Sequence, residues 1–291
     1  MKLLTYKSKR TGQICAGISF DGVQVFSLEE LGLPEGTSAL AFIRGLGCDF
    51  DSVQAPAAGG EAIAEVALLA PIPQPANNVI CVGLNYRAHV TESDDAGVIQ
   101  HSSPRPEAVY FTKNVNEALA PGGLIDGHPN ICDSLDYESE LAVVIGKDAF
   151  HVSKEEAGDY IFGFSVLNDV TARAIQQGRT QWFLGKSLDT FCPMGPWIVT
   201  RDELGAAPEL PIRSYINGEL RQNGNTGDLI HSIAEIIEDL TAGITLRAGT
   251  IIATGTPAGV GMGFQPPKYL KSGDVVRCEI EGIGVLENAV K

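Results

Sequence analysis

The feature that most constrains this chain is a pair of carboxylates that leads directly into an apolar, strand-like segment. Glu138 and Glu140 precede residues 141–145, which are all apolar. Successive side chains of a strand face opposite sides, so the two carboxylates share one side. At about 6.5 Å and an effective dielectric near 20, they repel each other by roughly 2.5 kcal/mol. A buried strand therefore predicts a compensating cation, whereas a half-exposed strand would leave both carboxylates in solvent.

A third carboxylate, Asp169, follows Asn168 at the end of another apolar segment, residues 160–167. Three carboxylates without a nearby Cys or His cluster suit Mg²⁺ or Mn²⁺ better than zinc, and Ca²⁺ also accepts oxygen ligands. The sequence leaves a second role open for Asp169, as the N-cap of a helix predicted to contain Gln176.

Composition and charge exclude several classes of partner. The 33 glycines and 16 prolines favour a turn-rich, strand-rich protein over a helical bundle. A net charge of −15 repels nucleic acid and anionic membranes, so we expect neither as a partner. The six cysteines are scattered, and the chain has no signal-like start and no run of 18 apolar residues. We therefore expect a cytoplasmic location.

Three alternating prolines in residues 70–75 mark a linker, because they hold the backbone extended. They predict a small N-terminal domain, residues 1–70, and a catalytic domain, residues 71–291. In the first, residues 14–20 and 23–26 flank Asp21-Gly22, which predicts a hairpin. Residues 28–32 and 39–45 predict short helices.

Short β-type segments separated by Gly and Pro dominate the rest of the chain. Their irregular spacing predicts an α+β, mostly β fold, a mixed β-sandwich roll, and argues against a regular βαβ array. The clearest helix is 233–240, with a capping box of Ser232 and Glu235, and a shorter helix begins at Ser153. The predicted strands are residues 79–82, 109–112, 141–145, 160–167, 212–216, 250–253 and 275–280.

His89 and Glu92 lie three residues apart, so one helical turn would bring them together. The carboxylate could then orient the imidazole as a general base, or the two could form an ordinary surface ion pair. The polar stretch 93–106 is typical of a lid.

Two further features leave alternatives open. Lys186 follows the apolar residues 182–185 and is either a snorkelling surface lysine or a buried functional one. The glycines of residues 255–261 let backbone N–H groups approach an anion, or simply form a tight loop.

Together these segments resemble the fumarylacetoacetate hydrolase superfamily over roughly residues 77–290. Each motif is weak alone, but seven in the same order make the resemblance specific. In chain order they are Asn85-Tyr86 with His89 and Glu92, Phe111-Thr112-Lys113, Tyr137-Glu138-Ser139-Glu140-Leu141, Asn168-Asp169-Val170-Thr171-Ala172-Arg173, Gly185-Lys186-Ser187-Leu188-Asp189, Cys192-Pro193-Met194-Gly195-Pro196 and Gly255-Thr256-Pro257-Ala258-Gly259-Val260-Gly261.

The resemblance implies a mixed β-roll, a homodimer and a small anionic 2-oxo acid as substrate. It implies Mg²⁺ or Mn²⁺ on Glu138, Glu140 and Asp169, and a catalytic His89–Glu92 dyad on a lid that becomes ordered with substrate. It also assigns Lys186 to catalysis. The substrate-binding residues that it implies are Lys113, Arg173, Gln176, Gly255 and Thr256.

For the activity, the resemblance favours hydrolysis of a C–C bond in a 2,4-dioxo acid of the acylpyruvate or fumarylpyruvate type. His89 would activate water, and the metal and Lys186 would stabilise a pyruvate enolate. Oxaloacetate decarboxylation would form the same enolate by loss of CO₂, and isomerisation of the 2-hydroxyhepta-2,4-diene-1,7-dioate type would move only protons. Both share the need to stabilise an enolate and stay open. A metal-binding module without turnover is the remaining hypothesis.

Overall fold

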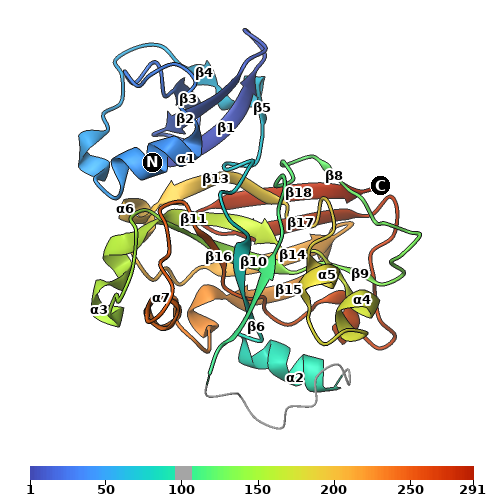
Figure 1. Ribbon diagram of the computed structural model, residues 1–291. Helices are drawn as coiled ribbons and strands as arrows, with labels where there is room; N and C mark the ends of the chain where they lie inside the picture. Colours follow the sequence, from blue (N-terminus) through green and yellow to red (C-terminus); the bar gives the residue numbers. More distant parts are fainter. Residues whose placement is uncertain (96–106) are drawn as a thin grey trace.

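The computed structural model describes residues 1–95 and 107–291 of a mostly β protein (Figure 1). Residues 96–106, which include most of the predicted lid, lie outside the described residues. The first residues of the stretch predicted as a lid, 93–95, belong to the helix α2 (Arg87–Asp95), and the lid itself stays a prediction. Within the described ranges, no helix is long and apolar enough to cross a membrane.

The N-terminal segment forms a small group of strands and one helix (Figure 1, blue). The predicted Asp21-Gly22 hairpin is confirmed, since β2 and β3 pair antiparallel and Asp21 accepts from the Val23 and Gln24 amides. The helix predicted at 39–45 is confirmed as α1. The elements are β1 (Lys2–Ser8), β2 (Ile14–Ser19), β3 (Gln24–Ser27), α1 (Ala39–Leu46), η1 (Phe50–Ser52), β4 (Glu61–Ala62), η2 (Ile63–Glu65) and β5 (Val66–Leu68).

The helix predicted at residues 28–32 is wrong. The amide of Leu33 donates to the Leu28 carbonyl and Gly32 has φ 87°, which closes a single turn. A residue in this left-handed region ends a helix, and Pro34 follows directly.

An eleven-stranded sheet runs through both parts of the chain, in the order β4-β3-β2-β1-β13-β11-β10-β16-β6-β7, with β5 also paired to β1. Leu3 of β1 pairs with Ile198 of β13, so the sheet crosses the boundary proposed at residue 70. The division into two domains remains a proposal. The additional strands are β6 (Val79–Gly83), β7 (Val109–Lys113), β10 (Ser139–Ile145), β11 (Ile161–Asn168), β13 (Met194–Thr200) and β16 (Ile251–Ala253).

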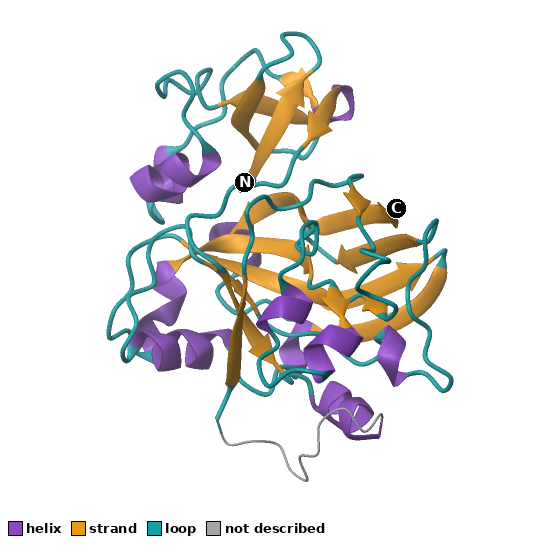
Figure 2. Ribbon diagram, turned by 45° about the vertical axis from the view of Figure 1, so that its right-hand side comes forward, coloured by secondary structure: helices purple, strands orange, loops and turns teal. Residues whose placement is uncertain are grey.

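A five-stranded sheet, in the order β15-β14-β17-β18-β8, packs on this sheet, and its β14, β17 and β18 contact β10 and β11. Figure 2 shows the strands filling the larger body, with helices mainly around its lower edge. These strands are β8 (Leu124–Ile125), β14 (Pro211–Ile216), β15 (Glu219–Asn225), β17 (Val275–Ile280) and β18 (Gly284–Val290); β9 (Leu135–Asp136) and β12 (Thr171–Ala172) form a separate pair.

Strand β10 is buried on both faces. Leu141 and Val143 point into the core shared with the five-stranded sheet, whereas Ala142 and Val144 join the core that includes Leu3. This two-sided burial explains the continuous apolar run, since only a half-exposed strand alternates apolar and polar residues. The mostly β prediction and the seven predicted strands are confirmed, as β6, β7, β10, β11, β14, β16 and β17.

Strands β1, β13, β15 and β18 were not predicted. The polar residues of β15 and Pro196 within β13 hide the strand pattern. The capping box predicted at Ser232 and Glu235 is present, and the helix predicted to begin at Ser153 also starts with a capping box. The helices of the catalytic part are α2, α3 (Lys154–Ala157), η3 (Gly158–Tyr160), α4 (Arg173–Gln177), α5 (Phe183–Lys186), α6 (Arg201–Leu204), η4 (Thr226–Asp228), α7 (Ile233–Thr241) and η5 (Gly261–Gly263).

We expect Ser232→Ala to lower the free energy of unfolding by about 1 kcal/mol, because Ser232 accepts from the Glu235 amide at the start of α7. Ser232→Thr is the control, since threonine keeps the hydroxyl that accepts from the Glu235 amide and donates to the Glu235 carboxylate. Urea denaturation of the two variants measures the difference. Equal loss in both variants would mean that the cap is not the cause.

Candidate metal centre and active-site pocket

Glu138, Glu140 and Asp169 converge because β10 and β11 pair in one register. Ser139 lies opposite Asn168, and the Asp169 amide donates to the Glu138 carbonyl at 2.8 Å. All three carboxylates are buried, and one oxygen from each lies within 4.8 Å of the others. The solvent-face alternative for the two glutamates is therefore wrong. The N-cap alternative for Asp169 is also wrong, since Ala172 occupies that position.

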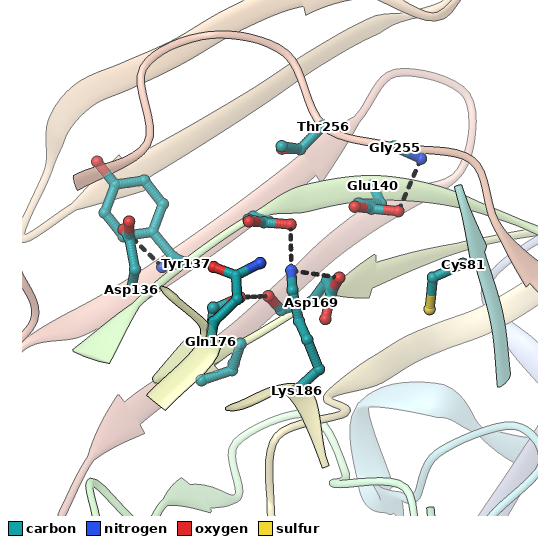
Figure 3. A network of polar contacts seen from close by, with 12 residues as sticks. Cys81, Asp136, Tyr137, Glu140, Asp169, Gln176, Lys186, Gly255 and Thr256 are labelled. Carbon is teal, nitrogen blue, oxygen red and sulfur yellow. Dashed lines mark hydrogen bonds and ion pairs between the residues drawn. The ribbon is translucent and has the colours of Figure 1, made fainter. Parts of the chain in front are cut away.

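Lys186 is buried between two of these carboxylates. Its Nζ lies 2.8 Å from Glu138 and 2.7 Å from Asp169 (Figure 3), so the snorkelling alternative is wrong. Arg173 Nη1 lies 2.6 Å from Glu138, and Lys113 contacts Asp169. Burial by itself raises the pKa of Glu138, but the charges of Lys186 and Arg173 outweigh it and hold that pKa below its usual value.

At Glu140 the compensation is too weak, because the charge of Lys186 and the Gly255 amide lower its pKa less than the other contributions raise it. Burial, and then the charges of Asp169 and Glu138, raise the pKa of Glu140 well above its usual value. Among the described residues, its carboxylate accepts one hydrogen bond, from the Gly255 amide at 2.8 Å (Figure 3). Gly255 was predicted to bind the substrate. In the structure its amide donates a hydrogen bond to Glu140, and the substrate-binding role stays a prediction.

The charges of the buried cluster fit a divalent cation. Asp136, Glu138, Glu140 and Asp169 face the cations of Lys113, Arg173 and Lys186, which leaves one negative charge in excess in the described cluster. A divalent ion would reverse this excess and leave the cluster ready for an anionic ligand. Carboxylate oxygens are the ligands that Mg²⁺ and Mn²⁺ prefer, so the residues fit either ion.

The predicted His89–Glu92 contact is formed on α2. His89 Nδ1 lies 2.9 Å from Glu92 Oε2, and His89 is buried, so this is no exposed surface pair. Because the carboxylate can only accept, Nδ1 carries the proton and Nε2 is left as the basic nitrogen. The second Glu92 oxygen accepts from the Gly259 amide at 2.8 Å. Both Glu92 oxygens are therefore fixed.

The loop that holds Glu92 requires glycine at two positions. A Cβ on Gly263 would overlap the Glu92 carboxylate, and a Cβ on Gly259, at φ 105°, would overlap the Arg221 carbonyl. Asp136 anchors the same loop by accepting from the amides of Gly261 (2.6 Å) and Met262 (3.0 Å).

Asp136 also accepts from Arg173 Nε at 2.8 Å. It therefore connects the carboxylate cluster to the loop on which Glu92 docks. Sequence analysis missed this role, although Asp136 belongs to the same acidic run as Glu138.

A cavity of about 480 Å³ opens above the carboxylates. Lys113 and Gly255 are not part of its lining; they contact Asp169 and Glu140 instead. The roles of all these residues remain proposals. The predicted residues that line it are His89, Glu138, Glu140, Arg173, Gln176, Lys186 and Thr256, and those that sequence analysis missed include Ser93, Tyr110, Phe111, Arg179, Trp182 and Met262.

We expect Glu140→Gln to stabilise the metal-free protein increasingly as the pH rises. The raised pKa of Glu140 means that its contribution to stability is present below about pH 4.5 and is lost at higher pH, as the buried carboxylate ionises. The Glu140→Gln variant does not lose this stability, because a glutamine side chain does not ionise. Thermal unfolding from pH 5 to 8 in EDTA measures it, and added Mn²⁺ should stabilise only the wild type. A variant equally stabilised by Mn²⁺ would contradict the metal assignment.

Gly263→Ala should release α2 from the loop, because the new methyl group displaces the Glu92 carboxylate. We expect faster amide hydrogen exchange in residues 87–95, with exchange in β10 unchanged. Gly45→Ala is the matched control, since a Cβ at Gly45 meets open space. Unchanged exchange in α2 would show that Glu92 docking does not depend on this glycine.

Comparison with known proteins agrees with this geometry. The family described as fumarylacetoacetate (FAA) hydrolase C-terminal matches residues 78–291. Oxaloacetate tautomerase YisK of Bacillus subtilis is 47% identical over 229 residues, which cover 78% of this chain and 74% of that protein.

Two solved structures match over the whole chain. Fumarylacetoacetate hydrolase of Exiguobacterium antarcticum is 39% identical with a TM-score of 0.86, and the match covers 100% of this chain and 99% of that one. Maleylpyruvate hydrolase of Sphingobium sp. SYK-6, solved with manganese(II) and pyruvate, is 28% identical with a TM-score of 0.76 and 98% coverage of that chain. The protein belongs to the fumarylacetoacetate hydrolase family.

Proposed function

We propose that this protein is a divalent-metal-dependent enzyme that acts on a small 2-oxo dicarboxylic acid through an enolate, and that it catalyses keto–enol tautomerisation of oxaloacetate. The observation that carries the proposal is that His89, whose Nδ1 is paired with Glu92, lines the same cavity as Glu138 and Glu140. A base beside a site for a hard cation is the arrangement that proton abstraction next to a carbonyl requires.

The cavity also suits an anionic 2-oxo acid. Arg173 lines it, and its buried Nη2 has no hydrogen-bond partner among the described residues. A buried guanidinium N–H without a partner is costly, so a substrate carboxylate is its natural acceptor. Mg²⁺ or Mn²⁺, held by Glu138, Glu140 and Asp169, would supply Lewis-acid polarisation of the 2-oxo group.

The protein residues then have distinct tasks. His89 Nε2 takes a proton from C3 of the keto form, and the same proton is returned to the enolate oxygen, so the reaction balances without a further reactant. Glu92 keeps the imidazole in the required tautomer. Lys186, already among the carboxylates, offsets the negative charge that develops on the enolate.

The choice of tautomerisation follows from the 47% identical relative, an oxaloacetate tautomerase. The resemblance found in the sequence alone favoured C–C bond hydrolysis, so tautomerisation replaces hydrolysis as the first candidate. C–C hydrolysis of an acylpyruvate remains the second candidate, because the structure solved with manganese and pyruvate is a maleylpyruvate hydrolase. Oxaloacetate decarboxylation, which would release CO₂ and leave the enolate of pyruvate, also stays open as an alternative. A cytoplasmic location and a homodimer also remain proposals.

The test is to follow decay of the enol of oxaloacetate by its ultraviolet absorbance with saturating Mn²⁺, corrected for the metal-only rate. We expect His89→Ala to lower the enzymatic rate by about 10²–10⁴-fold, because it removes the base. Thr91→Ala, on the exposed side of the same helix, should leave the rate unchanged.

Pyruvate release from acetylpyruvate is measured in parallel. Faster acetylpyruvate cleavage than tautomerisation would replace the proposal with the hydrolase. No turnover of either compound by the Mn²⁺-loaded wild type would favour the binding module.

A further inference from the structure

The cavity has an uneven distribution of charge. Among its described lining residues, the only carboxylates are Glu138 and Glu140, at the metal centre. The cations Arg173 and Lys186 are ion-paired with that centre. Arg179 differs, because it lines the same cavity, is exposed, and has no ion pair or hydrogen bond within the described ranges. Its positive charge is available to a ligand.

Ser93 provides a second unused donor in the same cavity. It is 1% exposed, and its hydroxyl has no hydrogen-bond partner among the residues that the structure describes. A buried hydroxyl without a partner costs about 1–3 kcal/mol. Thr91 on the same helix behaves differently, since its exposed hydroxyl donates back to the Arg87 carbonyl. Ser93 lines the cavity and makes no such local bond, so its donor is unused among the described residues.

The position of Ser93 relative to His89 indicates what it contacts. The two residues are four apart on α2, so they share one face of the helix, about 6 Å apart along its axis. If C3 of the substrate lies at His89, the next group of a four-carbon acid comes within reach of Ser93. In oxaloacetate that group is the C4 carboxylate.

We propose that Ser93 and Arg179 form a subsite for the distal carboxylate and restrict the enzyme to 2-oxo dicarboxylates. Ser93 donates a hydrogen bond to this carboxylate, and Arg179 supplies the charge that favours a carboxylate over an ester or a methyl ketone. The edge-to-face contact of Phe111 and Trp182, with ring centroids 5.2 Å apart, forms an apolar wall of the same cavity. The inference rests on the proposed function, because it assumes that His89 acts at C3.

The test compares oxaloacetate with its 4-ethyl ester, in which the distal carboxylate is neutral. For Ser93→Ala and Arg179→Gln we expect KM for oxaloacetate to rise by about tenfold or more, as for loss of a charge-assisted hydrogen bond. KM for the ester should change less than about twofold, because the ester lacks the recognised charge. The turnover number for oxaloacetate should stay near that of the wild type.

Two matched controls lie on α2 and do not line the cavity. Thr91→Ala removes an exposed hydroxyl, and Arg87→Gln removes an exposed positive charge. Neither should change KM for oxaloacetate. An equal effect of Arg87→Gln and Arg179→Gln would mean that net charge, and not a subsite, is responsible. An equal rise in KM for oxaloacetate and its ester in Ser93→Ala or Arg179→Gln would also overturn the proposal.

Binding measurements keep this inference separate from the proposed function. The Mn²⁺-loaded proteins are titrated with 3,3-dimethyloxaloacetate, which cannot enolise at C3, and with oxalate, which is too short to extend past the metal centre. The variants should bind the first more weakly than the wild type and the second equally well. This result in an enzyme that does not turn over oxaloacetate would support the subsite and reject the proposed reaction. Equal affinity of wild type and variants for dimethyloxaloacetate would reject the subsite.

Discussion

The structure depends on one electrostatic constraint, the burial of Glu138, Glu140 and Asp169 where β10 and β11 pair. The pairing of Ser139 with Asn168 brings the carboxylates together, and the apolar remainder of β10 removes them from water. Uncompensated carboxylates in such a place are strongly unfavourable, so Lys113, Lys186 and Arg173 are buried with them. Asp136, which is buried beside Arg173, is a fourth carboxylate, so the three cations are one charge short when all four carboxylates are ionised. The fold thus creates a site whose own electrostatics favour a divalent ion.

The same cluster is connected through hydrogen bonds to the His89–Glu92 pair. Arg173 contacts Asp136, Asp136 holds the amides of Gly261 and Met262, and the same loop donates the Gly259 amide to Glu92. Each contact in this series is a hydrogen bond of 3.0 Å or less. The metal centre and the base are therefore positioned by one connected set of residues, although they come from distant parts of the chain. Glycine at 259 and 263 permits the close approach.

The chemistry that these parts support is common to several members of the family. A cation site, a buried lysine and a histidine with a basic Nε2 suit any reaction that begins with an enolate. The relatives named above include a tautomerase and a hydrolase. We propose that substrates are distinguished by another part of the cavity, which Ser93, Arg179 and the Phe111–Trp182 pair line.

The sequence by itself determined many of the elements and the identity of the acidic cluster. Strand β10 was predictable because two-sided burial leaves a continuous apolar run, and α7 because its capping box is local. The i, i+3 spacing likewise predicted the His89–Glu92 contact. Strand β15 escaped prediction because its side chains are largely polar, and the helix at 28–32 was wrong because a single hydrogen-bonded turn satisfies that segment.

Only the tertiary structure decided which alternatives hold. Burial of Glu138, Glu140 and Lys186 depends on sheets that pack around them, and no local pattern reports that packing. The role of Asp136 could not be predicted from the sequence, because it depends on contacts with residues far away along the chain. The same holds for Ser93, whose buried hydroxyl has no hydrogen-bond partner among the described residues. Sequence determines which groups are present and which neighbours they have along the chain. Long-range packing decides which charges share a low-dielectric space, and therefore which of them can act together.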